Sequence, residues 1–286
     1  MPIDLEELTF RNGEVMLNAV AAGPHDGPLV ILLHGFPEFW YSWHRQIAPL
    51  AAVGFRVIVP DQRGYNKSSK LPDVASYALP HLAEDVLAIA DQLGAERFFL
   101  AGHDWGAAVA WSVAILHPER LHKLAILNVP HPSVMLRYLR KSARQLRRSW
   151  YMLFFQVPFL PELAFASFNY RLGVRALVRS SRLGTFSEED LQRYREAWAQ
   201  PLALLGSMNW YRAAFRTRAK FADPIVRVPT KIIWGQRDAF LLYEMAEASL
   251  RYCTEAELVP FPDATHWVQH EEAARVSEML IQFFRG

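Results

Sequence analysis

The chain has 286 residues, of which 51% are hydrophobic and 21% are charged, and its formal net charge is +2. This composition excludes a disordered chain, and so small a net charge gives no general attraction to nucleic acid or acidic membranes. The single cysteine, Cys253, excludes an intrachain disulfide, so stability must come from a packed core.

Strand and helix signals alternate over the first 129 residues. The elements we expect are a strand pair around the Asn12-Gly13 turn, strands at 29–33, 55–59, 98–100 and 124–127, and helices at 81–93 and 107–116. Short, wholly apolar strands separated by amphipathic helices are typical of a parallel sheet with helices on both faces.

The alternation stops after Pro130, and residues 131–222 are rich in aromatic residues, leucine and arginine. This composition predicts several helices. Over residues 136–150, apolar residues form one stripe and six basic residues form another face of one expected helix. Such a helix can bind a membrane or an acidic partner, but we expect its apolar stripe to pack on the core and its charged face to be solvated.

Alternation resumes after Pro229, with strands expected at 231–234 and 257–259 and helices at 241–250 and 268–284. The chain therefore reads as one α/β domain in two pieces with a helical insertion. We assign the first part of the core to residues 1–129, a helical cap or lid to 130–223, and the second part of the core to 224–286. Insertions at such a place commonly cover a site.

The sequence Gly102-His103-Asp104-Trp105-Gly106 lies between an expected strand and an expected helix. It matches the nucleophile elbow, in which small flanking residues allow a tight turn that lifts the central side chain above the sheet. Esterases with this elbow have serine at the centre, whereas here the centre is Asp104. A glycine-rich turn with a helix-capping aspartate would look the same, so the interpretation depends on catalytic partners elsewhere.

Candidate partners follow later in the chain. Asp238 comes after the strand expected at 231–234, and His266 lies between the last strand and the last helix. The order of nucleophile, acid and histidine is that of the elbow hydrolases. Both residues lie in loops at the carboxyl ends of strands, where sheet enzymes gather their catalytic groups. We therefore predict a triad of Asp104, His266 and Asp238.

An aspartate nucleophile restricts the reaction. With an ordinary pKa near 3.9 it is already an anion at neutral pH, so it needs no base. Attack on a carbonyl carbon would give an anhydride, whereas attack on an sp³ carbon gives a stable ester and expels a halide or a strained oxygen. His266 would then activate water, Asp238 would orient His266, and the backbone N–H groups of Phe36 and Trp105 would form the oxyanion hole.

With these residues the sequence resembles the soluble epoxide hydrolases of the α/β-hydrolase superfamily over nearly its whole length. Besides the elbow, the resemblance rests on His34-Gly35-Phe36-Pro37-Glu38, Asp61-Gln62-Arg63-Gly64-Tyr65 and Asn209-Trp210-Tyr211-Arg212. It implies an α/β-hydrolase fold, a mostly parallel central sheet flanked by helices, with an inserted helical cap. It also implies hydrolysis of an epoxide to a vicinal diol, without a metal or an organic cofactor.

The resemblance further implies that cap tyrosines protonate the epoxide oxygen. Tyr211 stands at the third position of the motif that supplies one donor in that family, and the aromatic segment 150–156 places the other at Tyr151. Tyr138 and Tyr170 are weaker alternatives for the second donor. Tyrosine has an ordinary pKa near 10, so it stays protonated at neutral pH and can strengthen its hydrogen bond as the alkoxide forms.

The partners that we expect are a small hydrophobic epoxide and water. We expect the substrate to contact Phe36, Pro37, Trp105, Phe154 and Trp267. We expect no nucleic-acid partner, no stable membrane association, and a monomer or a homodimer. The acidic start of the chain lacks a continuous apolar segment, which predicts no signal peptide and a cytoplasmic location.

Two other functions remain open for the same fold. Haloalkane dehalogenases use the same set of Asp, His and Asp, and the indole of Trp105 could hold a halide. However, they commonly have a second halide donor, often Asn, where this chain has Phe36, and fluoroacetate dehalogenases usually have Arg in place of Trp105. A non-catalytic receptor would keep the pocket without needing a complete triad.

Overall fold

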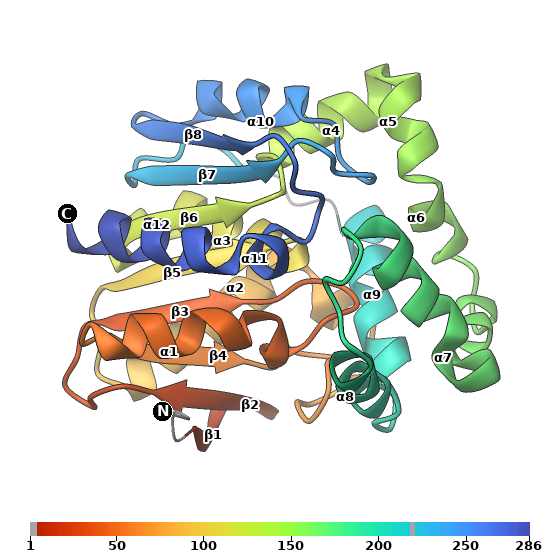
Figure 1. Cartoon of the computed structure of the whole chain (residues 1–286), viewed down its shortest axis with the longest axis horizontal. Coiled ribbons are helices and arrows are strands. Elements are labelled where there is room, and N and C mark those ends of the chain that lie inside the picture. The colour runs from red at the N-terminus through yellow and green to blue at the C-terminus, as the bar shows by residue number, and fades with distance from the viewer. Residues whose placement is uncertain (1–4, 218–220) are drawn as a thin grey trace.

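The computed structural model describes residues 5–217 and 221–286, which form an eight-stranded sheet flanked by helices, with further helices at one end (Figure 1). Residues 1–4, which belong to the segment used to predict the absence of a signal peptide, lie outside the described residues. The strands are β1 (Glu6–Asn12), β2 (Val15–Ala22), β3 (Leu29–Leu33), β4 (Arg56–Pro60), β5 (Phe98–His103), β6 (Leu121–Leu127), β7 (Thr230–Gly235) and β8 (Ala256–Phe261).

The sheet has the order β1-β2-β4-β3-β5-β6-β7-β8. β2 pairs antiparallel with both β1 and β4, and the remaining neighbours pair in parallel. The carboxyl ends of the parallel strands therefore meet at one edge of the sheet, which Figure 1 shows turned toward the helices at the right. This edge is where the loops with the predicted catalytic residues leave the sheet.

Helices cover both faces of the sheet, which is why the central strands are apolar throughout. In β3, Ile31 and Leu33 pack in the core on the side of α2 and α3, whereas Val30 and Leu32 pack on the side of α1 and α12. This alternation follows the two-residue period of a strand. The helices are α1 (His44–Ala52), α2 (Leu79–Gln92), α3 (Trp105–Leu116), α4 (Pro132–Lys141), α5 (Ala143–Arg148), α6 (Trp150–Phe154), α7 (Leu160–Ser180), α8 (Glu188–Trp198), α9 (Ala203–Arg216), α10 (Glu244–Ser249), α11 (Val268–Glu271) and α12 (Ala273–Arg285).

The chain between β6 and β7 forms α4 to α9, which lie beyond the carboxyl edge of the sheet (Figure 1). We call this group of helices the cap. Among the described residues, no helix is at once long and apolar enough to cross a membrane. The domain boundaries at 129/130 and 223/224 stay predictions.

The prediction of a single basic helix at 136–150 is wrong. The chain forms three short helices there, because Ser142 and Ser149 leave the helical conformation that would join α4 to α5 and α5 to α6. The hydroxyl of Ser142 caps α5 by accepting a hydrogen bond from the amide of Gln145. The apolar stripe is not packed on the core either, since Leu136, Leu146 and Trp150 are all exposed.

Two expected helices near the carboxyl end also differ in extent. The helix expected at 268–284 is divided into α11 and α12 at Glu272, whose carboxylate pairs with Arg182 of the cap at 2.8 Å. The helix expected at 241–250 is limited to α10 and a following turn of 3₁₀ helix at Leu250–Tyr252.

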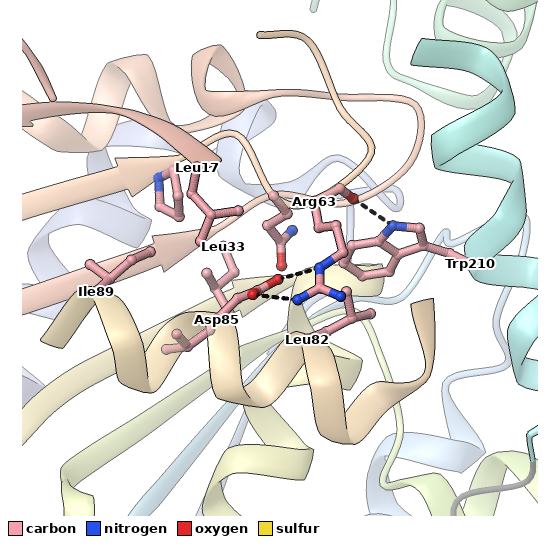
Figure 2. A pocket seen from close by; sticks show the side chains of 10 residues that line it. Leu17, Leu33, Arg63, Leu82, Asp85, Ile89 and Trp210 are labelled. Carbon is pink, nitrogen blue, oxygen red and sulfur yellow. Dashed lines mark hydrogen bonds and ion pairs between the residues drawn. The ribbon is translucent and has the colours of Figure 1, made fainter. Parts of the chain in front are cut away.

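A buried ion pair holds the loop after β4 against α2, as Figure 2 shows. The guanidinium of Arg63 donates two hydrogen bonds to the carboxylate of Asp85, from Nε at 2.8 Å and from Nη2 at 2.6 Å. Asn12 donates a further hydrogen bond to the same carboxylate at 2.8 Å. Above this pair, the indole N–H of Trp210 in α9 donates to the backbone oxygen of Arg63 at 2.9 Å. The pair thus supports a contact between the core and the cap.

We expect Asp85→Ala to lower the free energy of unfolding by about 3–5 kcal/mol, because it leaves the charge of Arg63 buried without a counter-ion. Urea denaturation followed by circular dichroism measures this. Glu84→Ala removes an exposed carboxylate from the same helix and should stay within about 0.5 kcal/mol of the wild type. Equal midpoints for Asp85→Ala and the wild type would contradict the stabilising role of the pair.

Candidate active site

The turn between β5 and α3 holds Asp104 in a backbone conformation that most residues avoid, with φ of 48° and ψ of −124°. Close packing explains the flanking glycines. A Cβ atom on Gly102 would lie 2.4 Å from the backbone oxygen of Gly106, and one on Gly106 would lie 2.3 Å from that of Leu33. The sequence thus folds into the strained elbow that presents the carboxylate beyond the edge of the sheet.

The loop after β3 passes directly over this carboxylate. The backbone N–H of Phe36 donates a hydrogen bond to Oδ1 of Asp104 at 2.8 Å. Trp105 is the first residue of α3, so its N–H belongs to the first turn, where amides have no acceptor within the helix. The amide of Phe36 therefore lies where an oxyanion hole requires a donor, and the role of the Trp105 amide stays a prediction.

The histidine predicted for the triad is held by a carboxylate that is itself fully hydrogen-bonded. Nδ1 of His266 lies 2.7 Å from Oδ2 of Asp238. The other oxygen of Asp238 accepts from the amides of Phe240 and Leu241 at 2.7 and 2.9 Å. Asn128 donates to Oδ2 from its side chain at 2.7 Å. These bonds fix the orientation of the buried Asp238 side chain toward His266.

The remaining nitrogen of His266, Nε2, lies 3.5 Å from Oδ2 of Asp104. Burial lowers the pKa of His266, but the charges of Asp238 and Asp104 and their hydrogen bonds outweigh it and raise the pKa to about 10. Burial likewise raises the pKa of Asp104, yet its hydrogen bond and charge interaction with His266 hold that pKa below its ordinary value. His266 is therefore an imidazolium that lies between the side chains of Asp238 and Asp104.

The cap brings both predicted tyrosines to the cavity that Asp104 lines. Tyr151 comes from α6 and Tyr211 from α9, and their ring centroids are 5.9 Å apart. The ring of Tyr211 also meets that of Trp105 edge-on at 5.0 Å. Burial and the nearby charge of Asp104 raise the pKa of Tyr151 well above its ordinary value, and burial and neighbouring groups do the same for Tyr211. Both hydroxyl groups therefore stay protonated at neutral pH.

Hydrogen bonds from α9 fix the two tyrosines relative to each other. Arg212 donates to the backbone oxygens of Phe155 and Val157, each at 3.0 Å, just beyond the end of α6. In the opposite direction, the side chain of Gln156 donates a hydrogen bond to the backbone oxygen of Tyr211 at 3.2 Å. The motif residue next to Tyr211 thus anchors the segment that carries Tyr151.

A cavity of about 750 Å³ opens beside these groups, and Asp104, Trp105, Tyr151 and Tyr211 all line it. Most of the rest of its lining is apolar and comes from α3, α4, α6 and α9. Four residues that we expected to contact the substrate are placed around the cavity rather than among its lining residues. Phe36 packs against the ring of Tyr211, Pro37 is buried, Phe154 packs on Trp150, and Trp267 is buried beside His266.

A second buried polar network lies behind the triad. The carboxylate of Glu38 accepts a hydrogen bond from Tyr194 of α8 at 2.9 Å and lies 3.0 and 2.7 Å from ring nitrogens of His103 and His270. Burial raises the pKa of Glu38, but the hydrogen bonds from the two histidines outweigh it and hold the pKa well below its ordinary value. His103 also contacts the backbone oxygen of His266 at 2.8 Å. The carboxylate of Glu38 thus connects the loop after β3, the end of β5, helix α11 and the cap helix α8.

Sequence reasoning gave no role to several of these residues. Glu38 and His103 stood in the recognised motifs, and Asn128 follows a strand directly, but none was assigned a function. The signal that could have revealed Asn128 is its position at the carboxyl edge of the sheet, between the two loops that carry the triad. For Glu38 no such signal exists, because its partners come from three separate segments of the chain.

The fold and the site together define an α/β-hydrolase with aspartate at the nucleophile elbow. A family model described as "alpha/beta hydrolase fold" matches residues 28–273. The chain is 41% identical to the AB hydrolase superfamily protein YfhM of Bacillus subtilis (strain 168), covering 95% of each chain, and 36% identical to epoxide hydrolase 2 of Caenorhabditis elegans, covering 94% of this chain and 77% of the relative. A crystal structure of Bacillus megaterium epoxide hydrolase with an inhibitor superimposes with a TM-score of 0.89 at 29% identity, covering 98% of this chain and all of the other. The chain belongs to the epoxide hydrolase family of the α/β-hydrolase superfamily.

Proposed function

We propose that this protein converts an epoxide and water to a vicinal diol through a covalent ester on Asp104. The observation that carries the proposal is that two protonated tyrosines, the half-buried Tyr151 and the buried Tyr211, line the same apolar cavity as the carboxylate of Asp104. A halide leaving group has no use for two hydroxyl donors of this kind, whereas an epoxide oxygen needs a proton as it leaves. We place the reaction in the cytoplasm, since a lone cysteine fits a reducing compartment.

In the first step, Oδ2 of Asp104 attacks a ring carbon and the bond from that carbon to the epoxide oxygen breaks. Tyr151 and Tyr211 hydrogen-bond the leaving oxygen and supply its proton. Because these bonds strengthen as negative charge develops, they stabilise the transition state more than the bound substrate. Oδ1 of Asp104 keeps its hydrogen bond to the amide of Phe36 and becomes the carbonyl oxygen of the ester.

Ester formation also prepares the second step. It removes the negative charge of Asp104, which is one of the causes that raise the pKa of His266. His266 then releases its proton more easily. This proton returns to the cap tyrosine that protonated the leaving oxygen, and His266 becomes a neutral base. His266 takes a proton from water, the water oxygen attacks the ester carbon of Asp104, and the diol leaves. The amides of Phe36 and Trp105 stabilise the intermediate oxyanion.

The test is to incubate the purified protein with racemic styrene oxide and, in parallel, with 1-bromobutane, and to measure diol and bromide. We expect diol without bromide. Bromide without diol would replace the proposal by a dehalogenase function, in which the tyrosines only pack. Tight binding of epoxides without turnover, across aryl and alkyl examples, would instead favour a receptor.

A further inference from the structure

The cap exposes most of the large apolar side chains that are exposed on this protein. Within the described residues, seventeen large hydrophobic side chains are exposed, and twelve of them lie between residues 136 and 183. The most exposed include Phe168 at 87%, Phe159 at 73% and Trp150 at 64%. The twelve are Leu136, Leu146, Trp150, Leu153, Val157, Phe159, Leu160, Leu163, Phe168, Leu172, Val178 and Leu183.

The same segment is strongly basic. Residues 136–183 contain ten Lys and Arg residues and one acidic residue, Glu162, whereas the rest of the chain has 21 basic and 28 acidic residues. The small net charge of the whole chain therefore hides a charge of +9 in this segment and −7 elsewhere. Seven of the basic side chains are exposed, namely Arg140, Lys141, Arg144, Arg147, Arg171, Arg175 and Arg179.

These exposed cations have few internal partners. Arg144 pairs with Glu244 at 3.0 Å. The other six have no carboxylate within 4.0 Å in the part of the chain that the structure describes. Because cations and apolar side chains share one segment, we name the exposed residues between 136 and 183 the cap face. Figure 1 shows α5, α6 and α7 following one another along the side of the cap that is turned away from the sheet.

The cap face is continuous with the cavity. Leu136, Leu146 and Leu153 are exposed on this face and also line the cavity that contains Asp104. Arg140 lines the cavity as well. The mouth of the cavity is therefore bordered by apolar side chains and a cation rather than by a uniformly polar rim.

We infer that the cap face docks reversibly on the surface of an anionic lipid bilayer. Basic side chains are attracted to acidic headgroups, and exposed Phe, Trp and Leu side chains are stabilised at the boundary between headgroups and acyl chains. A second copy placed symmetrically on this face would bring two segments of +9 together, so the charge disfavours an isologous dimer there. Docking itself does not require turnover; only its consequence, the direct entry of lipid-dissolved epoxides into the cavity, rests on the proposed function.

Co-sedimentation with vesicles tests the docking without measuring activity. We expect the wild type to bind vesicles of phosphatidylcholine mixed with phosphatidylserine at low salt, to bind phosphatidylcholine alone much more weakly, and to be released by high salt. The triple variant Arg171→Gln, Arg175→Gln and Arg179→Gln should lower the partition coefficient about 100-fold, since each basic residue near an anionic surface contributes roughly fivefold. These three residues do not line the cavity, so turnover of a water-soluble epoxide should not change.

The matched control is Arg11→Gln, Arg251→Gln and Arg285→Gln, which makes the same change in net charge with exposed residues outside the cap face. It should keep nearly all vesicle binding. A second pair of changes, Leu163→Gln and Phe168→Asn, tests the apolar contribution and should weaken binding with all the charges retained. The inference is overturned if the wild type does not bind anionic vesicles, or if the control triple variant loses as much binding as the triple variant of Arg171, Arg175 and Arg179. It is also overturned if light scattering shows an oligomer that buries the cap face and that the latter triple variant dissociates.

Discussion

A His266→Gln variant is expected to stop halfway through the reaction, with the opened epoxide bound to Asp104 as an ester. The nucleophile needs no base to remove its proton, because a carboxyl group with an ordinary pKa near 3.9 is an anion at neutral pH, and the amide of Phe36 still donates a hydrogen bond to Oδ1 in the variant. Ring opening therefore remains possible. Hydrolysis of the ester needs the base, and loss of a general base typically costs about 10²–10⁴-fold in rate.

Intact mass spectrometry after incubation with styrene oxide measures this result as a gain equal to one substrate molecule. Tryptic digestion should place the gain on the peptide of residues 98–120, which contains Asp104. Asp104→Ala should show neither the mass gain nor any diol. His25→Gln, a change to an exposed histidine, should turn over like the wild type. An unmodified Asp104 in a His266→Gln protein that has consumed no substrate would contradict the two-step route.

Loss of both cap hydroxyl groups is the second change with a large expected effect. Tyr151→Phe or Tyr211→Phe alone should slow ring opening by less than about 100-fold, because the other tyrosine still donates to the leaving oxygen. The double variant should lose at least about 1000-fold, since removing a preorganised donor from a developing oxyanion commonly costs 10²–10³ in kcat. Phe keeps the ring packing against Phe155, so the fold should not change.

Single-turnover formation of the ester, with enzyme in excess, isolates this step from hydrolysis. Tyr170→Phe is the matched control, because Tyr170 is a cap tyrosine that packs on Trp198 and is not among the cavity-lining residues. Its rate should equal that of the wild type. If the double variant opened the ring at the wild-type rate, the tyrosines would have only a packing role.

The core of this fold could be predicted because its signals are local. A strand such as residues 29–33 is buried on both faces, so every position is apolar and the pattern is visible without any knowledge of its neighbours. The elbow was equally visible, since its glycines are imposed by backbone that a Cβ atom would meet at 2.4 Å within the turn for Gly102 and at 2.3 Å in the adjacent strand β3 for Gly106. The strands fell where expected to within a few residues, and the α/β-hydrolase fold class was confirmed.

The cap could not be predicted in the same way. The helical period of residues 136–150 is real, but two serines divide the segment, and Leu136, Leu139 and Leu146 of the apolar stripe line the cavity, which periodicity alone does not reveal. The pattern indicates which residues share one side of a helix, but it does not indicate which part of the protein or solvent that side contacts. Of the residues expected to contact the substrate, Trp105 lines the cavity, whereas Phe36 packs on Tyr211 and Trp267 packs on His266, and their contact with substrate stays a prediction.

The position of the cap in the sequence has a consequence for how the protein is made. Asp104 is synthesised with the first six strands, whereas Asp238 and His266 come after β7 and β8, the last two strands at that edge of the sheet. Until residue 230 has left the ribosome, β6 is an open edge with unpaired backbone groups, which is a hazard for aggregation. The nascent chain therefore carries Asp104, the proposed nucleophile, and its cap before it carries His266, the proposed base. Competence for hydrolysis is among the last properties that the growing chain acquires.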